Sequence, residues 1–436
     1  MQRYFLGLFA TLLLLGNGCT APGNERPNIV FVLVDDMNTR LLPYLPRLAE
    51  LTRAKGMSFA MTVPTPVCAP SRATILTGKY AHNTSVTRNG PRGGGIWGFQ
   101  KSGSEASTFA VWLHEVGYRT GFFGKYLNEH GRAGTEMPPG WDRWVGYGKM
   151  SFSRVGFETL EDGGVTRAIG KTYDTDFFAR EAAQWVATAP EPFLAVWMPM
   201  APHGPFVAPQ RHRGRFDDVK LTWPPSFSAD PTEVEPLTRT RLEMMLGIED
   251  GLAELIAALE KRGALARTYV VFTSDHGLFM GEHGFAAGKG EPYEETTQVP
   301  LFVRGPGVPI GSSDALVAST DLAPTFAAIA GAPIPPDVDG RSFLPLLHGQ
   351  EWPQPRKRFL LEWWDPDGSS PWLGLRTAKQ KFVRYADGTC KSFQLDADPY
   401  EMQSGPCDDA FAKQSASFID RLVACSGASC VAAESE

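Results

Sequence analysis

The chain has no excess of positive charge. Its 436 residues include 42 Lys and Arg against 48 Asp and Glu, which gives a formal net charge of −6. A chain this acidic is a poor non-specific binder of nucleic acid, so we expect no nucleic-acid partner. An anionic ligand can still bind in a local basic pocket. The hydrophobic content of 43% and the charged content of 21% are typical of a globular protein.

Long apolar runs are also scarce. The run Tyr4–Leu15 follows Arg3 and is followed by small residues up to Cys19. This order is typical of an export signal, and the run is too short to span a bilayer comfortably. We therefore predict a leader over residues 1–19 and an exported protein of the bacterial periplasm or cell surface. Cys19 directly after a glycine resembles a lipoprotein signal and predicts a lipid anchor as the chain's membrane contact.

Cysteine is sparse, with six residues in the chain. Cys19 belongs to the leader and Cys68 to a motif described below. An exported chain can form disulfides, and the simplest pairing of the others joins sequence neighbours, although four cysteines allow three connectivities. A zinc site is the alternative, but the spacings are not C-x-x-C and no histidine follows His348. The two expected pairs are Cys390–Cys407 and Cys425–Cys430.

Apolar and β-branched runs alternate with amphipathic runs that end at helix stop signals. The predicted strands are 28–34, 118–123, 193–198, 268–273 and 299–303, and the predicted helices are 45–55, 108–116, 176–189, 236–261 and 319–330. This alternation predicts an α/β fold, with a large, mostly parallel sheet between helices. The Gly- and Pro-rich stretch 89–103 and the polar stretch 203–231 are predicted loops beside a substrate cleft.

The pattern changes after about Phe343. Short strand-like runs at 358–363, 381–385 and 392–395 are followed by a helix over 412–424. This predicts a small α+β subdomain with an antiparallel sheet. The expected division is a catalytic domain over 25–348 and a small C-terminal subdomain over 349–436.

Polar side chains follow the ends of four predicted strands. In a parallel sheet these ends share one edge, where active sites lie. An Asp-Asp pair alone is most often a solvated turn, but acidic residues at two strand tips supply the hard oxygen ligands that Ca²⁺ requires. A histidine among them is a softer ligand. The residues at the strand ends are Asp35 and Asp36, Lys125, His203, and Asp275 and His276.

The most specific feature is Cys68-Ala69-Pro70-Ser71-Arg72, followed by Leu76-Thr77-Gly78. A lone cysteine is most often a small buried apolar residue. Here Pro70 suits a first helical turn, the N–H groups of a helix start attract a sulfate-like anion, and Arg72 adds a forked cationic donor. The motif resembles the maturation signature of the type I sulfatases of the alkaline phosphatase superfamily.

This resemblance implies an unusual nucleophile. In that family a formylglycine-generating enzyme oxidises the cysteine to an aldehyde, whose hydrate attacks the sulfur of a sulfate ester. The resemblance implies one Ca²⁺ bound by Asp35, Asp36, Asp275, His276 and the modified Cys68. It also implies that Arg72, Lys125 and Lys289 neutralise the sulfate, that Asp275 is the base, and that His203 and Lys289 assist the leaving alcohol.

The segment Gly124-Lys125-Tyr126-Leu127-Asn128 resembles the N-acetylglucosamine-6-sulfatase branch of the family. The commonest family form has a histidine where this chain has Leu127, and Asn128 and His130 are both candidates to act in its place. His283 is expected behind the residues that touch substrate. Trp363 and Trp364 suit stacking on a sugar ring, although large aromatic residues more often pack.

The resemblance therefore predicts a sulfatase acting on a sulfated carbohydrate such as 6-O-sulfated N-acetylglucosamine. Two alternatives stay open. One is a phosphodiester or phosphonate monoester hydrolase of the same superfamily, which can share the motif. The other is a non-catalytic glycan-binding lipoprotein in which Cys68 remains a thiol.

Overall fold

The protein is described from a computed structural model that covers residues 26–90, 93–134, 136–148, 153–364 and 370–436. The predicted leader and Cys19 lie outside these residues. No helix within them has both the length and the apolar character needed to cross a bilayer.

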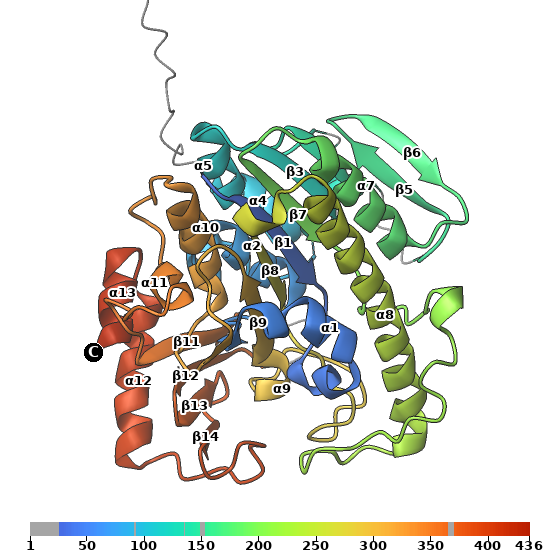
Figure 1. The fold of residues 1–436 in the computed structure, drawn as a ribbon. Coiled ribbons are helices and arrows are strands. Elements are labelled where there is room, and N and C mark those ends of the chain that lie inside the picture. Colours follow the sequence, from blue (N-terminus) through green and yellow to red (C-terminus); the bar gives the residue numbers. More distant parts are fainter. Residues whose placement is uncertain (1–25, 91–92, 135, 149–152, 365–369) are drawn as a thin grey trace, which may run out of the picture.

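A ten-stranded sheet forms the centre of the molecule (Figure 1), and β5 and β9 run against the other strands. The sheet is therefore mixed but mostly parallel, as predicted. Its order is β10 (Gly311–Ser313), β2 (Met57–Thr62), β9 (Gln298–Arg304), β8 (Thr268–Ser274), β1 (Asn28–Val34), β7 (Phe193–Met198), β3 (Arg119–Gly124), β4 (Arg143–Tyr147), β5 (Phe157–Glu161) and β6 (Val165–Ile169).

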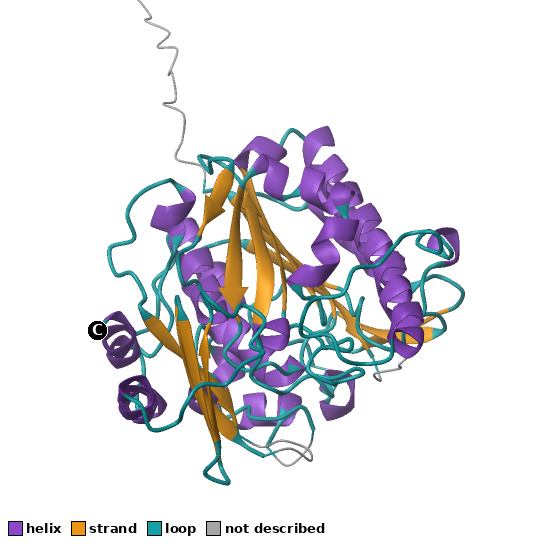
Figure 2. Cartoon of the chain, turned by 90° about the horizontal axis from the view of Figure 1, so that it is seen from below, coloured by secondary structure: helices purple, strands orange, loops and turns teal. Residues whose placement is uncertain are grey.

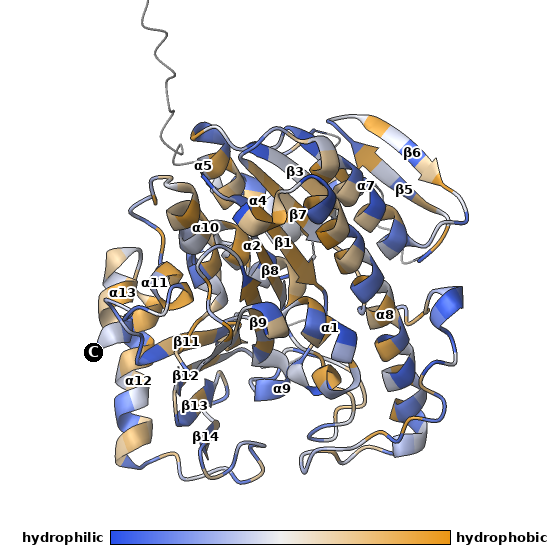
Figure 3. Cartoon of the chain, in the orientation of Figure 1, coloured by the Kyte–Doolittle hydropathy of each residue, from blue (hydrophilic) through white to orange (hydrophobic). Residues whose placement is uncertain are grey.

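Helices cover both faces of this sheet because its central strands are apolar on both sides. All residues of β1, β7 and β8 are buried, and Figure 3 shows these strands as hydrophobic. Alternate residues of β1 enter two separate cores. One core holds α2 (Cys68–Thr77), α4 (Gly95–Lys101), α5 (Phe109–Glu115) and α10 (Leu322–Ala330), and the other holds α1 (Pro46–Leu51), α7 (Asp174–Thr188) and α8 (Pro231–Lys261).

A second, antiparallel sheet lies beside the first (Figure 2). Its strands in order are β11 (Arg358–Trp363), β12 (Trp372–Thr377), β13 (Gln380–Tyr385) and β14 (Cys390–Gln394). Two helices pack against it, α12 (Ala410–Val423) and α13 (Ala428–Ser435). The predicted fold class is confirmed. The boundary near residue 348 stays a prediction; α11 (Leu344–Leu347) ends just before it and β11 begins at Arg358.

The last helix is anchored by a buried acid. The side chain of Glu434 on α13 is fully buried and contacts Arg341, Arg356 and Tyr80. Arg356 also pairs with Asp321 at the start of α10. These contacts fix the end of the chain to the large sheet domain.

Several predicted elements differ in their bounds. The helix expected over 45–55 is α1 followed by a 3-10 turn, Arg53–Lys55. Helix α8 begins before the expected Pro236, because Asp230 caps it and Pro231 occupies its first position. The stretch 89–103 was predicted as a loop, and this prediction was wrong for the part that forms α4. The stretch 203–231 is irregular except for a 3-10 turn, Gln210–His212.

Both expected disulfides are present, Cys390–Cys407 and Cys425–Cys430. The first joins the start of β14 to the following loop, and the second closes the turn between α12 and α13. Sulfurs bonded to one another are not available to a zinc ion, so the zinc alternative was wrong.

Candidate functional site

Two strand tips bring three carboxylates together at the carboxyl edge of the sheet. Asp35 and Asp36 follow β1, and Asp275 follows β8, its parallel neighbour. Asp36 has a φ of 74°, a left-handed conformation uncommon for residues other than glycine. Its N–H donates to Oδ1 of Asp275 at 3.2 Å, and its carbonyl accepts from the buried Arg241 on α8. The turn after β1 is therefore held from two sides.

Cys68 is the first residue of α2, a helix in which every residue is buried. The N–H of Ala69, which has no partner within the helix, donates to Oδ1 of Asn89 at 2.8 Å. Oγ of Ser71 donates to the main-chain oxygen of Asp275 at 2.6 Å. The start of α2 is thereby fixed to the tip of β8. Sequence reasoning did not single out Asn89, although its loop was predicted to border the site.

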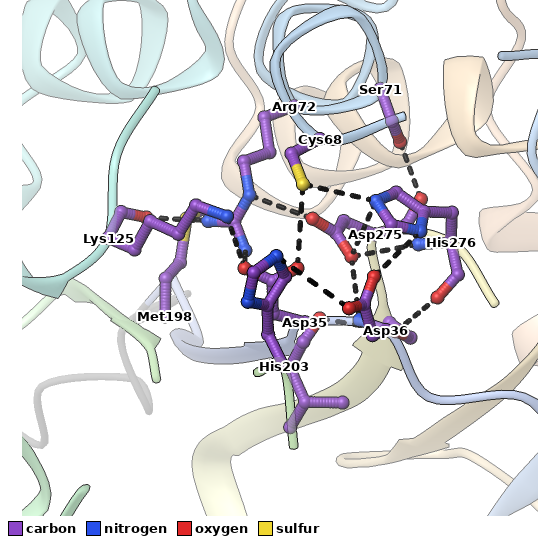
Figure 4. Close-up of polar contacts among 12 residues, drawn as sticks. Asp35, Asp36, Cys68, Ser71, Arg72, Lys125, Met198, His203, Asp275 and His276 are labelled. Atoms are coloured by element: carbon purple, nitrogen blue, oxygen red, sulfur yellow. Dashed lines mark hydrogen bonds and ion pairs between the residues drawn. The ribbon is translucent and has the colours of Figure 1, made fainter. Parts of the chain in front are cut away.

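The thiol of Cys68 lies among charged groups (Figure 4). Its Sγ is 3.3 Å from Nε2 of His276, as Figure 4 shows. It is also 3.2 Å from Nζ of Lys289. Oδ1 of Asp35 is 3.7 Å away. Burial and Asp35 act to raise the pKa of this thiol. Lys125, Lys289 and His276 outweigh both and hold the pKa well below its ordinary value.

Two cations balance the carboxylates on the other side. Arg72 is fully buried, with Nε 2.9 Å from Oδ2 of Asp275 and Nη2 3.3 Å from Oδ2 of Asp35. Lys125, which follows β3, forms a second ion pair with Asp35. Burial acts to raise the pKa of Asp35, but Lys125, His203 and Arg72 hold it well below its ordinary value. The buried carboxylate is therefore kept ionised by its neighbours.

Asp36 is surrounded in the same way. Nζ of Lys289 lies 2.8 Å from its Oδ1, Nδ1 of His276 lies 3.2 Å from the same oxygen, and Nε2 of His203 lies 3.8 Å from Oδ2. Burial acts to raise the pKa of Asp36, but these three cations lower it to about 2. Burial lowers the pKa of His276, yet Asp275 and other groups raise it to about 9.

His203 lies in the loop after β7, and its backbone is held by a residue that sequence reasoning missed. The buried Arg154 donates to the carbonyl of His203 and pairs with Asp174 at 2.8 Å. Burial lowers the pKa of His203, but Asp36 and Asp35 raise it above its ordinary value. No sequence motif marks Arg154, because its role depends on a contact between distant segments.

The predicted metal ligands converge, as Figure 4 shows. In each of two groups of residues, the possible ligand atoms all lie within 4.8 Å of one another. The first group is Asp35, Asp36, Cys68 and His203, and the second is Asp35, Cys68, Asp275 and His276. Asp35 is common to both groups, and its carboxylate with those of Asp36 and Asp275 supplies hard oxygen atoms that fit a divalent cation. All the residues singled out as catalytic or metal-binding therefore meet at one place.

The position of the missing histidine is occupied by core structure. Leu127 is 2% exposed and packs in the core that holds α2. His130 packs against Tyr126 and Trp144, and burial lowers its pKa to about 4. Among the described residues, neither Asn128 nor His130 bonds to Cys68, whereas Nε2 of His276 lies 3.3 Å from its Sγ and a ring nitrogen of His203 lies within 4.8 Å of it. Neither of the two candidates from the sequence, Asn128 and His130, therefore contacts Cys68 among the described bonds.

Three other residues lie around the site. His283 stacks on Tyr293 with ring centroids 3.7 Å apart and lies 3.4 Å from Glu295, and among the described contacts it has none with Cys68. Trp363 packs on Gly290, the residue after Lys289. A Cβ atom at position 290 would lie 2.8 Å from the Trp363 ring. Trp364 donates to Glu362. Both tryptophans are half-buried at the end of β11.

The fold and site together define an α/β protein with a mostly parallel sheet, in which buried carboxylates, Cys68 and several cations meet at one sheet edge. The chain belongs to the sulfatase family, because the family model described as Sulfatase matches residues 27–332. A second model, N-sulphoglucosamine sulphohydrolase, C-terminal, matches residues 281–426.

Curated relatives are sulfatases. The putative extracellular sulfatase Sulf-1 homolog of Caenorhabditis elegans is 31% identical over 382 residues, covering 80% of this chain and 53% of the relative. The N-acetylglucosamine-6-sulfatase of Homo sapiens is 34% identical over 380 residues, covering 78% and 68%. The chain thus spans about half the length of the first of these relatives.

Solved structures show the same fold. A structure in complex with its substrate D-glucosamine-2-N,6-O-disulfate aligns with a TM-score of 0.77 and 22% identity, over 92% of this chain and 97% of the other. A phosphonate monoester hydrolase from Silicibacter pomeroyi aligns with a TM-score of 0.72 and 23% identity, over 91% and 94%.

Proposed function

We propose that this protein hydrolyses sulfate esters on sulfated sugars, with 6-O-sulfated N-acetylglucosamine as the leading substrate. The observation that carries the proposal is the position of Cys68, at the start of a buried helix and in contact with Lys289 and His276. The relatives named N-acetylglucosamine-6-sulfatase and the neighbour solved with a sulfated glucosamine support the class of substrate.

Position 68 supplies the nucleophile. Cys68, oxidised to formylglycine by a formylglycine-generating enzyme and then hydrated, carries a hydroxyl that attacks the sulfur of the ester, and the bond from sulfur to the sugar oxygen breaks. The second hydroxyl at position 68 then loses its proton, the aldehyde reforms and the bound sulfate is expelled. Asp275, whose ligand oxygen lies within 4.8 Å of Sγ, is the base for that hydroxyl. Arg72 and the N–H groups of Asp36 and His276 hold the carboxylate of Asp275 in place.

The cations around position 68 bind the sulfate group. Lys289, Lys125 and Arg72 offset the negative charge on the sulfate oxygens, in a site that excludes water and therefore strengthens such contacts. His203 is half-buried at the open side and donates a proton to the departing alcohol, with Lys289 assisting. In this scheme His203 takes the place of the histidine that other family members have after the lysine.

Asp35, Asp36, Asp275 and His276, together with position 68, would hold Ca²⁺. When bound, the ion supplies positive charge that offsets charge on the sulfate. Asp35 and Cys68 belong to both groups of ligand atoms, one of which includes Asp36 and the other Asp275 and His276.

The compartment is part of the proposal. Relatives named extracellular sulfatases and the predicted leader support export. We place the protein in the periplasm or at the cell surface, with a lipid anchor at Cys19.

Replacing Cys68 tests the proposal directly. Cys68→Ser should reduce hydrolysis of N-acetylglucosamine-6-sulfate by at least about 10³-fold, because the nucleophile is lost. The melting temperature should stay within a few degrees. Thr74→Ser, a conservative change on the same buried helix, is the control and should keep its activity. Full activity of a well-folded Cys68→Ser protein contradicts the scheme.

Mass spectrometry separates an enzyme from a non-catalytic glycan-binding lipoprotein. Conversion of the thiol to an aldehyde lowers the mass of the peptide containing Cys68 by about 18 Da. We expect the loss in protein from a maturation-competent host and an unshifted peptide from a host without the maturing enzyme. An unshifted peptide in every host favours the binding protein.

A phosphonate or phosphodiester hydrolase is the second candidate, favoured by the fold of the Silicibacter pomeroyi enzyme. Both esters place a tetrahedral anion among the same cations, so the specificity ratio has to be measured. We expect kcat/KM for a sulfate monoester to exceed that for phenyl phosphonate monoesters. The reverse order replaces the sulfatase proposal with the second candidate.

A further inference from the structure

A groove lies at the end of the small sheet farthest from Lys289. It has a volume of about 560 Å³ and is formed by the start of β11, the turn between β12 and β13, and one side of α12. Its lining includes Lys357, Arg358, Thr377, Lys379, Gln380 and Phe418. Among the described residues, the one acid in its lining is Asp314, which is exposed.

Arg358 is the central feature of this groove. Its guanidinium stacks on Phe418 at 3.5 Å from the ring centroid. Its Nε and Nη1 atoms are buried and have no hydrogen-bond partner among the described residues. Burial and the nearby Arg421 lower the pKa of Arg358, and the carboxylate of Glu436 opposes this in part. A buried donor without an acceptor costs about 1–3 kcal/mol, and more when it is charged, so an anion that reached it would be bound favourably.

The neighbouring cations leave the groove with a positive excess. Lys379 is exposed in the β12–β13 turn and forms no ion pair with the described residues. Lys357 is exposed and donates to the main-chain oxygen of Glu436 at 3.1 Å. Arg421 differs, because it is paired with the carboxylate of Glu436 at 2.6 Å. Arg358 and Lys379 therefore face the groove without an ion pair among the described residues. The acids near them are Asp314 in the lining and Glu436, which is paired with Arg421.

The groove is separate from the catalytic site. Arg358 is opposite Thr377 at one end of the β11–β12 pair, and Trp363 is opposite Trp372 at the other. Trp363 packs on Gly290, next to Lys289. Five residues of extended strand span about 17 Å, so one small sulfated monosaccharide cannot reach both places.

We propose that this groove is a second anion site, which binds acidic groups of the same glycan chain whose sulfate enters the catalytic site. The inference rests on the proposed function for the identity of the chain. Arg358 recognises a sulfate or carboxylate through its forked donors, and Lys379 adds a point charge beside it. The ligand is an acidic polysaccharide long enough to extend along the small sheet.

Binding is tested without turnover. Heparin-derived octasaccharide is titrated calorimetrically into full-length Cys68→Ala protein and into the same protein carrying Arg358→Gln or Lys379→Gln. We expect the dissociation constant to rise about tenfold for Arg358→Gln and several-fold for Lys379→Gln. Arg384→Gln is the control, because Arg384 on β13 removes the same charge but is paired with Asp420 outside the groove.

Two outcomes overturn the proposal: unchanged binding in both groove variants, or an equal loss in Arg384→Gln. If Arg358→Gln does not fold, the exposed Lys379→Gln decides alone. Carboxyl-reduced and O-desulfated octasaccharides show which anion is bound. If Arg358 binds the group that a modified octasaccharide lacks, Arg358→Gln no longer changes the dissociation constant for that octasaccharide. If the protein has no sulfatase activity but still binds the octasaccharide in the groove, the proposed function is refuted and the groove remains an anion-binding site.

Discussion

At the scale of single residues, Glu249 differs from the carboxylates of the candidate site. Asp35 and Asp36 are buried but surrounded by cations, whereas Glu249 on α8 is 2% exposed and its Oε1 accepts the N–H of Leu48 at 2.9 Å. Burial raises the pKa of Glu249 to about 7, and the hydrogen bond and Arg47 oppose this only in part. Between about pH 4.5 and 7 the folded protein therefore holds a proton that the unfolded chain has lost.

This difference predicts the sign of a pH effect on stability. A raised carboxyl pKa means that the free energy of unfolding falls as the pH rises through this window. Glu249→Gln keeps the acceptor and removes the titration, so its stability relative to wild type should grow from pH 5 to pH 8 by about 1 kcal/mol. Urea unfolding at several pH values measures it. Glu254→Gln, at an exposed position of α8, is the control, and an identical pH slope for Glu249→Gln and wild type refutes the assignment.

The sequence could predict the site residues whose positions follow from the strand that precedes them, but not those that reach the site through tertiary contacts. Asp35, His203 and Asp275 follow strand ends, and the rule for parallel sheets brings such residues together without any further information. Arg241 supports Asp36 from α8, but Glu243 and Glu249 are also buried on that helix, so its charge alone did not mark it as a site residue. Arg154 had no signal in the sequence, because it reaches His203 only through the tertiary fold.

At the scale of elements, the second sheet holds the loop that carries Lys289. Nε1 of the buried Trp372 on β12 donates to the carbonyl of Gly290 at 2.7 Å. Nζ of Lys381 on β13 donates to the carbonyl of Pro292 at 2.8 Å and pairs with Glu294 at 2.7 Å. The small sheet therefore acts on the candidate site by fixing this loop.

Removing one of these bonds should affect activity more than stability. Trp372→Phe keeps an aromatic ring but loses the donor to Gly290, so kcat should fall about tenfold while KM changes little, since misplacing a charged group acts on the transition state. Trp352→Phe is the matched control, because its Nε1 also donates to a carbonyl, that of Ser342, at 2.8 Å. Equal kcat values in the two variants would show that the bond has no positioning role.

Strand and helix prediction succeeded where strands are buried on both faces and failed at the edges. Strands β5 and β6 were not predicted, although Asp162 and Gly163 between them both have positive φ and form the kind of Asp-Gly turn that joins hairpin strands. Helix α4 was missed because its glycines are poor helix formers and packing against the core outweighs that preference. Strand β12 contains a glycine and a charged residue, and cross-strand pairing stabilises it.

At the scale of the whole molecule, a metal that binds the folded state alone stabilises it by mass action. At one hundred times the dissociation constant the gain is about 2.7 kcal/mol. We therefore expect Ca²⁺ added to EGTA-treated protein to raise the melting temperature by several degrees, and Mg²⁺ to raise it less, because Mg²⁺ demands tighter octahedral geometry. Scanning calorimetry measures both.

Variants locate that effect. Asp36→Asn should abolish most of the thermal response to Ca²⁺, because it removes a carboxylate from the donor group. Asp250→Asn, a surface acid on α8 paired with Arg47 and Arg211, should keep the response. A response that survives in Asp36→Asn places the ion elsewhere.

The burial of Cys68 sets the order of folding and the proposed oxidation. Cys68 is 1% exposed and every residue of its helix is enclosed, so no second enzyme can reach this thiol once the large domain has closed around it. Glu434 on α13 completes the buried contacts with Arg341 and Arg356. The proposed oxidation of Cys68 must therefore take place before the large domain has closed around its helix.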